Sequence, residues 1–449
     1  MIFVERAYAL LTELANSGKL EPSVIEQLLA RHPRFQNISY PLALPPLLLD
    51  AKSLDRIRQQ TESYVELLEK VIFLYRRDPE VRAFFGFDRN ANKLIEAEGD
   101  LPRAISICRL DGYVKHGSDA LQILENNADC PAGTLFTTRL NRVIRELVSE
   151  ILYAPPLLPM DNDDSFIDTL VRACSMRYGQ DARIHAVVLQ PYGLGNVESE
   201  EIAKFLRKLG YECSVVDPRV LQLSNEGLIW EGQRIDLVWN KINTSVWNQI
   251  VADNPEIVDT FTHVLENFHR PIILNSFSSR YIAEAKTSLA IMHDPRFSNR
   301  FLPQEKKLIE ELIPWTTRLD EQPIVKFDGK EWVLADLLRE RQFDLVIKQQ
   351  YDIRGEGVTI GRDVSASLWH DIIASSWGRG AVAQRYVTPE RYPVQCIGFD
   401  TFSKLNISLD CFVFDGKLVG LGAKASNTNK VNLFQGGTKL AVIVVEREK

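Results

Sequence analysis

Residues 104–131 read AISICRLDGYVKHGSDALQILENNADCP, and this stretch decides how the rest of the sequence is interpreted. Two short apolar runs, at 104–108 and 121–124, are separated by a polar turn at 115–118. Apolar runs of this length on either side of a polar turn are typical of paired strands. The sequence therefore predicts a hairpin in which residues two apart share a face.

Four polar side chains lie on these two predicted strands. Arg109 and Asp111 are expected on one face of the first strand, and Glu125 and Asn127 on one face of the second. If the strands pair, two carboxylates and a carboxamide converge, and such oxygen donors suit a hard divalent ion such as Mg²⁺. An arginine beside that ion would bind an anion that develops during a reaction. The alternative is an ordinary salt-bridged hairpin, because charged residues on strand faces are common.

The segment 183–241 predicts a β-α-β unit. An apolar strand at 184–189 is followed by a glycine-bearing turn, a helix over 198–209 and a second strand at 211–216. A third strand, at 235–239, is expected in the same sheet. This segment is therefore expected to form a Rossmann-like lobe around a right-handed crossover.

The C-terminal part is rich in predicted strands. They follow a helical passage that ends near residue 320 and lie at 343–348, 382–387, 409–414, 417–421 and 440–445. Asp415-Gly416 is the two-residue signal of a tight hairpin between two of them. We expect mainly an antiparallel sheet here, with a helix near 365–375.

A glycine-rich run follows Lys348. Residues 354–361 read RGEGVTIG, so backbone amides can approach a ligand closely and form an anion-binding nest, with Lys348 as a nearby point charge. The run predicts a lid over phosphate groups, and the alternative is a glycine-rich hairpin without a ligand. It is neither a Walker loop nor a dinucleotide fingerprint.

Other polar residues give weaker signals. Gln384, Arg385 and Tyr386 follow an apolar strand whose backbone edge could pair with a purine. Asn432 opens a loop and could add an oxygen donor, although a plain turn is the simpler interpretation. The glycines at 193–195 lack the third glycine of a nicotinamide-binding fingerprint. No Gly-x-Ser-x-Gly element is present, so a nucleophilic triad is not predicted.

Composition sets the broad class of protein. The 449 residues are 45% hydrophobic and 25% charged, which are ordinary globular values, and this length favours about three domains. A net charge of −7 without a basic run argues against a nucleic-acid partner. The most apolar stretches, 40–49 and 151–160, are broken by prolines and fall short of the roughly 18 residues that a membrane-spanning helix needs.

The N-terminal region is expected to be an all-helical cap over residues 1 to about 105. In 53–76 apolar positions recur at helical spacing beside charged residues on the other face. Residues 1–14 have the spacing of an amphipathic helix and not that of a signal peptide, and the six cysteines form no CxxC pair. These features predict a cytoplasmic protein with reduced thiols.

Together the motifs resemble the circularly permuted ATP-grasp enzymes, in particular the synthetase part of glutathionylspermidine synthase. In that family an Arg-x-Asp strand precedes a Glu-x-Asn strand with Asp and Pro just after it, and the nucleotide-gripping lysines come late. This sequence has the same order at 109–111, 125–131, 275–286 and Lys348 with its glycine run. The resemblance covers roughly residues 105–449, and the Glu-x-Asn-Ala-Asp-x-Pro string is its most specific part.

The resemblance implies roles for individual residues. Asp111, Glu125 and Asn127 are similar to the family's Mg²⁺ ligands, and Arg109 to the residue that stabilises the phosphorylated intermediate. The implied ATP-binding residues are the phosphate lysines, the mobile loop over the phosphates and the adenine-side hinge: Lys286 and Lys348, then Gly355, Gly357 and Thr359, then Gln384, Arg385 and Tyr386.

The resemblance also implies an α/β (α+β) fold, the ATP-grasp fold in circularly permuted order. Its parts would be a helical N-terminal region at 1–104, a metal- and acceptor-binding part at 105–165, a Rossmann-like pre-ATP-grasp lobe at 166–275 and an ATP-binding part at 276–449. The implied activity is ATP-dependent carboxylate-amine ligation through an acyl phosphate, with Mg²⁺ and ATP as cofactors and small molecules as partners. A homodimer is compatible with the sequence, and a non-catalytic nucleotide-binding scaffold or sensor is the alternative function.

Two departures from the family pattern stand out. The family often has Arg-x-Ser after the late hairpin, where this chain has Lys424-Ala425-Ser426. Residues 352–357 read DIRGEG instead of the tighter glycine-arginine-glutamate-glycine string of glutathionylspermidine synthase. The second departure argues against that enzyme's particular substrate.

Overall fold

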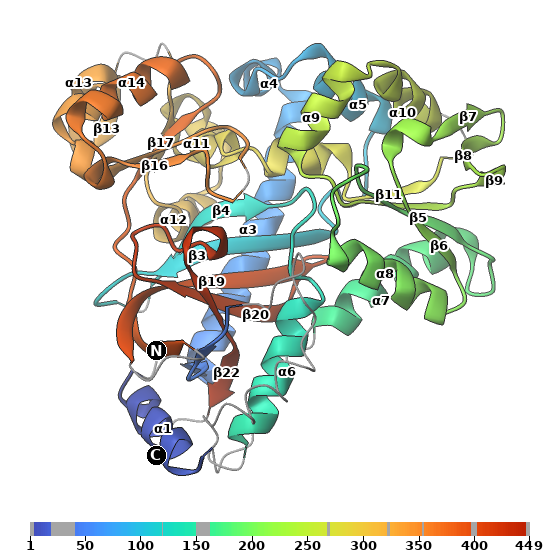
Figure 1. Ribbon diagram of the computed structural model, residues 1–449. Helices are drawn as coiled ribbons and strands as arrows, with labels where there is room; N and C mark the ends of the chain where they lie inside the picture. The colour runs from blue at the N-terminus through green and yellow to red at the C-terminus, as the bar shows by residue number, and fades with distance from the viewer. Residues whose placement is uncertain are drawn as a thin grey trace.

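A seven-stranded antiparallel sheet joins segments from both ends of the chain (Figure 1). The computed structural model describes residues 4–18, 41–118, 120–149, 162–266, 270–320, 324–352, 354–396 and 402–445. Strand β19 (Ser403–Phe414) pairs with β20 (Lys417–Ser426) along one edge, and with β18 (Arg391–Cys396) and then β3 (Ile107–Val114) along the other. The remaining strands are β4 (Leu121–Asn127) beside β3, β1 (Ala43–Leu44) beside β18 and β21 (Thr438–Leu440) beside β20.

The tight hairpin predicted at Asp415-Gly416 is confirmed. Both residues have positive φ, 45° and 77°, as a turn that follows the twist of the two strands requires. Strands β19 and β20 extend beyond the predicted ranges, and β19 is buried only from Ile407 to Phe414.

Helices cover the sheet but do not make up the whole N-terminal region. The long helix α3 (Ala51–Arg77) begins at Asp50, whose carboxylate accepts a hydrogen bond from the Ser53 amide at 2.7 Å. Helices α1 (Val4–Asn16), α4 (Pro79–Phe85), α5 (Arg89–Glu98) and α6 (Phe136–Val148) complete this region and the segment after the hairpin. The prediction of an all-helical cap is wrong at 43–50, where β1 and β2 (Leu47–Asp50) pair with distant strands, β2 in parallel with β22 (Val442–Val445). Strands of two and four residues are too short to show a helical or a strand period in the sequence, so their pairing with distant strands could not be predicted.

The predicted β-α-β unit forms part of a four-stranded parallel sheet. Its strand order is β11 (Ile272–Leu274), β10 (Leu237–Asn240), β5 (His185–Leu189) and β6 (Glu212–Val216). Helix α8 (Val197–Lys208) connects β5 to β6, and the other helices of this part are α7 (Asn162–Tyr178), α9 (Thr244–Asp253) and α10 (Glu256–Glu266). A small three-stranded sheet, β7 (Gln222–Ser224), β8 (Gly227–Trp230) and β9 (Gln233–Arg234), lies at its outer end (Figure 1). The three predicted strands therefore share one sheet, and β11 was not predicted.

A second antiparallel sheet stands apart from the first. Its order is β12 (Thr316–Arg318), β17 (Val382–Arg385), β15 (Leu345–Lys348) and β16 (Val358–Ile360). Helices α13 (Leu334–Glu340) and α14 (Ala366–Ser376) and the hairpin of β13 (Ile324–Phe327) and β14 (Lys330–Val333) accompany it at the upper left of Figure 1. In the chain, helices α11 (Thr287–His293) and α12 (Pro303–Leu312) follow β11 and precede β12. We call this unit the small sheet and the seven-stranded one the large sheet.

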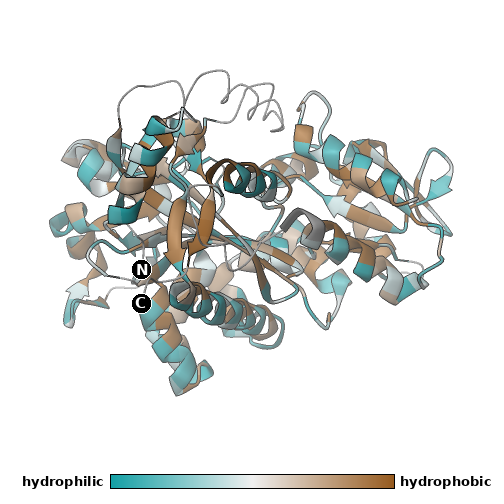
Figure 2. Ribbon diagram, turned by 90° about the horizontal axis from the view of Figure 1, so that it is seen from below, coloured by the Kyte–Doolittle hydropathy of each residue, from teal (hydrophilic) through white to brown (hydrophobic). Residues whose placement is uncertain are grey.

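The buried core consists of several apolar clusters. One buried apolar cluster extends from Ala7 to Val444 and includes residues of α3, the large sheet and α9–α11. Figure 2 shows the central strands mainly in hydrophobic colours, whereas the surrounding helices carry both kinds of position. Across the described ranges, no helix combines the length and apolar character needed to cross a bilayer. All six cysteines are free.

Candidate functional site

The predicted acidic hairpin forms as expected. In the register of β3 and β4, Arg109 lies opposite Asn127 and Asp111 opposite Glu125. The register shifts after Asp111, so that Leu124 is the extra residue of a bulge. A Cβ on Gly112 would stand 2.7 Å from the Gln122 carbonyl oxygen, so the bulge requires a glycine there.

Arg109 and Asp111 form a two-pronged ion pair. The Arg109 Nε and Nη2 donate to the two Asp111 carboxylate oxygens at 2.6 and 3.0 Å. Arg109 also donates to the Asn127 side-chain oxygen at 3.1 Å and to the Ala132 carbonyl at 2.8 Å. Four of its contacts thus go to the protein, and the guanidinium is held rigidly beside Asp111.

Behind this pair lies a charged network that sequence reasoning missed. Lys424 donates to Asp111 at 2.9 Å and pairs with Asp410 at 2.7 Å, and Lys439 donates to the other Asp410 oxygen at 2.9 Å. Asp410 is fully buried, which alone would raise its pKa, but the two lysines hold that pKa well below its usual range. Asp410 lies directly opposite Asp111 in the β3–β19 register, a long-range pairing that the sequence does not show.

Lys286 joins the hairpin to the glycine run. Its ammonium lies 2.8 Å from a Glu125 oxygen and 2.7 Å from an Asp352 oxygen, and its side chain is 1% exposed. Burial disfavours the charged form, but the two carboxylates raise the Lys286 pKa above its ordinary value. Lys286 is not among the residues that line the cavity described next.

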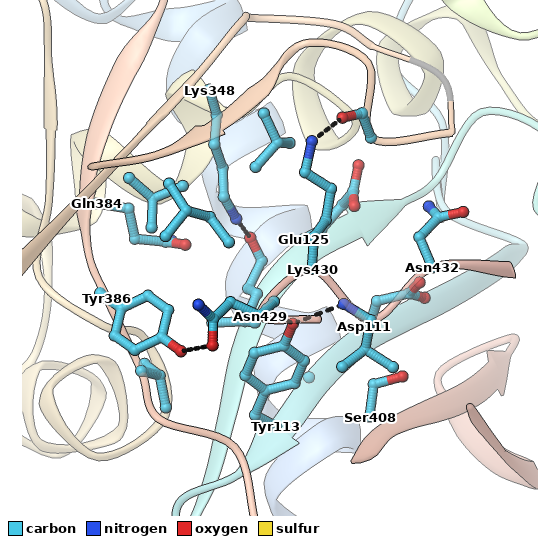
Figure 3. Close-up of a pocket in the computed structure, with 18 of the residues that line it drawn as sticks. Asp111, Tyr113, Glu125, Lys348, Gln384, Tyr386, Ser408, Asn429, Lys430 and Asn432 are labelled. Carbon is cyan, nitrogen blue, oxygen red and sulfur yellow. Dashed lines mark hydrogen bonds between the residues drawn. The ribbon is translucent and has the colours of Figure 1, made fainter. Parts of the chain in front are cut away.

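A cavity lies between the two sheets and brings together most of the predicted site residues (Figure 3). The space inside it, together with its mouth that opens to solvent, is roughly 720 Å³. Among the predicted residues, those on its wall are Asp111, Glu125, Lys348, Gly355, Gln384, Arg385, Tyr386 and Asn432. Glu125 from the large sheet and Lys348 from the small sheet therefore share one cavity.

One part of the cavity wall is apolar. Val346, Val358, Ile360 and Val387 come from the small-sheet side, and Leu124, Tyr113 and Val431 from the large-sheet side. Branched aliphatic and aromatic side chains of this kind suit a flat ring system.

The predicted hinge residues are engaged in contacts of their own. Gln384 is buried and donates to the Thr316 hydroxyl at 3.1 Å, and Arg385 lies over the Phe327 ring at 4.2 Å. The Tyr386 hydroxyl donates to the Asn429 side-chain oxygen at 3.1 Å. This hydrogen bond links the small sheet to the loop that follows β20 (Figure 3).

Two lysines face the cavity without a carboxylate partner. The Lys348 ammonium donates to the Leu124 carbonyl at 2.6 Å, the carbonyl of the bulge residue, and the Lys430 ammonium donates to the Gly355 carbonyl at 2.8 Å. Among the residues that the structure describes, no Asp or Glu oxygen lies within 4.0 Å of either ammonium. Burial lowers the pKa of Lys348 to about 8, with partial compensation by Glu125, and burial also lowers the pKa of Lys430.

The glycine run is only in part a loop. Arg354 and Gly355 have positive φ, 58° and 70°, and form a turn. Strand β16 begins at Val358, so Thr359 lies within a strand opposite Ile347. Val358 and Ile360 line the cavity and alternation turns Thr359 to the other face, so neither Thr359 nor Gly357 is a lining residue. Their predicted contact with ATP is not supported by this placement.

The oxygen donors fit a magnesium ion in part. Asp111 and Glu125 present carboxylates on the cavity wall. Asp111 already accepts four hydrogen bonds, two from Arg109 and one each from Lys424 and Asn127, so a metal would have to displace one of these donors. Glu125 accepts from Lys286 through one oxygen, which leaves its other oxygen available to a metal. Asn127 does not line the cavity, and its side-chain oxygen accepts a hydrogen bond from Arg109. In the described residues no group of three or more His, Cys, Asp or Glu side chains stands ready to hold a metal.

Lys430, Asn429 and Tyr113 are cavity residues that the sequence did not point to. Lys430 and Asn429 lie in the polar run 426–432 between two strands, which reads as an ordinary turn. A lysine within such a turn beside a predicted late hairpin was the only available signal, and it is a weak one.

Comparison with solved structures identifies a protein whose fold is similar to that of this chain. No protein family profile matches this sequence, and no curated protein matches it. The structure is similar to a glutathione synthetase-like effector from Globodera pallida solved in its apo form, with a TM-score of 0.61, 15% identity, and 95% of this chain and 98% of that chain covered. The two molecules therefore share a mixed α/β fold over nearly their whole length.

Two further structures are more distantly similar. One is a putative gamma-glutamylcysteine synthetase from Methylobacillus flagellatus KT, with a TM-score of 0.41, 12% identity, and 85% of this chain and 88% of that chain covered. The other is a RimK domain ATP-grasp protein from Sphaerobacter thermophilus DSM 20745, with a TM-score of 0.28, 12% identity, and 55% of this chain and 91% of that chain covered.

Proposed function

We propose that this chain is an ATP-grasp ligase that joins a carboxylate to an amine at the expense of ATP. The observation that carries the proposal is Lys348, a buried lysine that faces the cavity and whose ammonium has a carbonyl but no carboxylate partner among the described residues. A desolvated ammonium without a counter-ion is unfavourable unless an anion completes the site. The apolar wall beside Lys348 suits a base, so a nucleoside polyphosphate matches both parts of the cavity.

The fold supports the same proposal. The shared fold with a glutathione synthetase-like effector agrees with a ligase ancestry. The acidic hairpin precedes the parallel sheet in sequence and yet joins the C-terminal strands in one large sheet, which is the segment order that a circularly permuted ATP-grasp fold needs. In this proposal the parallel sheet is the Rossmann-like pre-ATP-grasp lobe.

The chain's own residues would act chiefly by position and charge. Lys348 would bind phosphate oxygens, and Lys424, which lines the cavity beside Asp111, would contact the acceptor anion or the transferred phosphoryl group. Arg109 holds Asp111 in place. Phosphoryl transfer asks mostly for such positioning and neutralisation.

The reaction would then have two steps. The terminal phosphoryl group passes from ATP to the carboxylate, which gives ADP and an acyl phosphate, and an amine displaces phosphate to form an amide. Asp111 and Glu125 are the residues that would hold Mg²⁺, which when bound neutralises phosphate charge. The turn at 354–357 and the loop at 429–432 would exclude water, since an acyl phosphate hydrolyses readily.

A second function is favoured by one observation. Both carboxylates of the proposed metal site already carry basic partners, Arg109 and Lys424 on Asp111 and Lys286 on Glu125. A protein that binds nucleotide as a scaffold or sensor, without turnover, would tolerate this pairing.

Release of ADP separates the two functions. Purified protein is incubated with ATP, Mg²⁺ and a panel of amino acids, peptides and polyamines, and ADP is measured by a coupled assay. ADP that appears only when a particular acid and amine are both present supports the ligase. Tight ATP binding without ADP release for any pair supports the scaffold, and no ATP binding at all overturns both.

A further inference from the structure

Lys430 reaches from one side of the cavity to the other. It lies in the loop between β20 and the short helix η6 (Leu433–Gln435), and its ammonium donates to the Gly355 carbonyl on the glycine turn. Figure 3 shows its side chain extended across the site toward that turn. It is one of the cavity-lining residues, and neither the motifs nor the family resemblance assigned it a role.

The electrostatic state of Lys430 resembles that of Lys348 and differs from that of three other nearby lysines. Lys286, Lys424 and Lys439 each lie within 3.0 Å of a carboxylate oxygen. Lys430 is half-buried and lowered in pKa, and Asp352 and Asp363 act on it only at longer range. A neutral carbonyl is a weaker partner for an ammonium than an anionic oxygen is. A phosphate in the cavity would therefore compete successfully for this ammonium.

The loop that follows β20 also contacts the glycine turn through Phe434 and Gln435. The Arg354 guanidinium lies 4.5 Å from the centre of the Phe434 ring, and the Gln435 amide donates to the Arg354 carbonyl at 3.1 Å. Gly355 has a φ of 70°, and a Cβ there would stand 3.2 Å from Lys430 Cδ. The turn at 354–357 thus rests directly on the segment 430–435.

We propose that Lys430 is a phosphate-binding residue of the cavity and that, until a phosphate takes its ammonium, it holds the glycine turn against the loop that follows β20. This inference rests on the proposed nucleotide site. In it Lys286, already neutralised by Glu125 and Asp352, positions the wall of the site. Lys430 takes the phosphate contact that the family resemblance implied for Lys286.

Calorimetry on the full chain tests the phosphate contact. Lys430→Met is compared with wild type, with the charge-preserving Lys430→Arg and with Lys330→Met, which removes an exposed lysine from β14. Each protein is titrated with ATP and Mg²⁺, with adenosine and with inorganic tripolyphosphate. We expect Lys430→Met to bind ATP and tripolyphosphate roughly ten- to a hundredfold more weakly, as for loss of one charge-assisted contact, with adenosine affinity unchanged. Lys430→Arg and Lys330→Met should stay close to wild type.

Hydrogen exchange tests the hold on the turn. Without ligand, the amides of residues 354–358 should exchange faster in Lys430→Met than in wild type, while those of β19 and β20 stay the same. Unchanged exchange would overturn the holding role. Unchanged affinity for ATP and tripolyphosphate, or an equal loss for adenosine, would overturn the phosphate role.

The two proposals fail separately. If wild type binds ATP and Lys430→Met binds it equally well, the nucleotide site stands and the role of Lys430 falls. If wild type binds tripolyphosphate through Lys430 but does not bind ATP, the phosphate contact stands and the nucleotide function falls. Binding of neither ligand by wild type overturns both.

Discussion

The electrostatic state of each lysine at this site depends on the groups that contact its ammonium. Lys348 and Lys286 were predicted to share one role on the strength of sequence, but the structure gives them opposite surroundings. Lys286 is neutralised by two carboxylates, whereas Lys348 has a carbonyl partner and a pKa of about 8. The family resemblance implied a phosphate contact for both lysines, but which one lacks a counter-ion depends on contacts between segments far apart in the chain.

Because the pKa of Lys348 is lowered to about 8, we expect the affinity for ATP to depend on pH. Its ammonium is charged below about pH 8 and neutral above it, so affinity for ATP should fall as pH rises from 7 to 9. Calorimetry at several pH values measures this, and Lys348→Met should bind more weakly at pH 7 and show a flatter dependence. A wild-type affinity that stays constant to pH 9 would contradict the assignment.

The lowered pKa of Lys348 also makes the stability of the fold depend on pH. The folded-state pKa of Lys348 is lower than the unfolded value, so the unfolded chain binds more protons between the two. This lysine therefore destabilises the fold below about pH 8, and that destabilisation is relieved as pH rises toward the unfolded value. The contribution of Lys348 to stability and its contribution to anion binding thus change in opposite directions with pH.

Glu125 should be essential for turnover and dispensable for folding. Its side chain is 27% exposed, and Lys286 keeps Asp352 as a partner when Glu125 is removed. We expect Glu125→Ala to lower ADP formation by about a hundredfold or more, equivalent to some 3 kcal/mol of barrier, with an unchanged circular dichroism spectrum. Glu331→Ala, which removes an exposed carboxylate from β14, is the matched control. Full turnover by purified Glu125→Ala would remove Glu125 from the mechanism.

Among the structural elements, the pairing of β3 and β4 was predicted, because alternation and a polar turn are local signals, whereas their register is known only from the structure. Its bulge was not predicted. The bulge leaves the Leu124 carbonyl to accept from Lys348, so an irregularity in one sheet positions a cation of the other. Short strands such as β1 and β2 were missed because their pairing comes from tertiary contacts alone.

A methyl group at position 112 should therefore disturb both the bulge and the site. Gly112→Ala brings a Cβ to 2.7 Å from the Gln122 carbonyl, a backbone atom that cannot move alone. We expect a loss of about 1–3 kcal/mol in the free energy of unfolding, as for overpacking, together with weaker ATP binding. Gly195→Ala is the control, because a Cβ there meets nothing within 4 Å. Equal urea midpoints for the two variants would show that the bulge accommodates a side chain.

At the scale of the whole molecule, the cavity exists only because two sheets face each other. Segments 107–127, 345–360, 382–387 and 424–432 all contribute to its wall. The sequence predicted most of these segments singly, and the family resemblance placed them in one site. The charged network of Asp410, Lys424 and Lys439 went unseen, since no local pattern reports which charges meet across the large sheet.

Ligand-induced stabilisation tests the site as a unit. A ligand that binds only the folded protein should stabilise it by about 2.7 kcal/mol at a hundred times its dissociation constant. We expect ATP with Mg²⁺ to raise the melting temperature by several degrees, and the nicotinamide dinucleotides to leave it unchanged. A rise with the dinucleotide alone would replace the nucleotide assignment with an oxidoreductase one.

The shared large sheet also has a consequence for biosynthesis. On the ribosome, β3 and β4 leave the exit tunnel early, while β19, which covers the outer edge of β3, is made only after most of the chain. Until then an unpaired strand edge with buried-type side chains is open to other nascent chains. Cellular folding of this protein should therefore depend on chaperones that shield the first third of the polypeptide until translation ends.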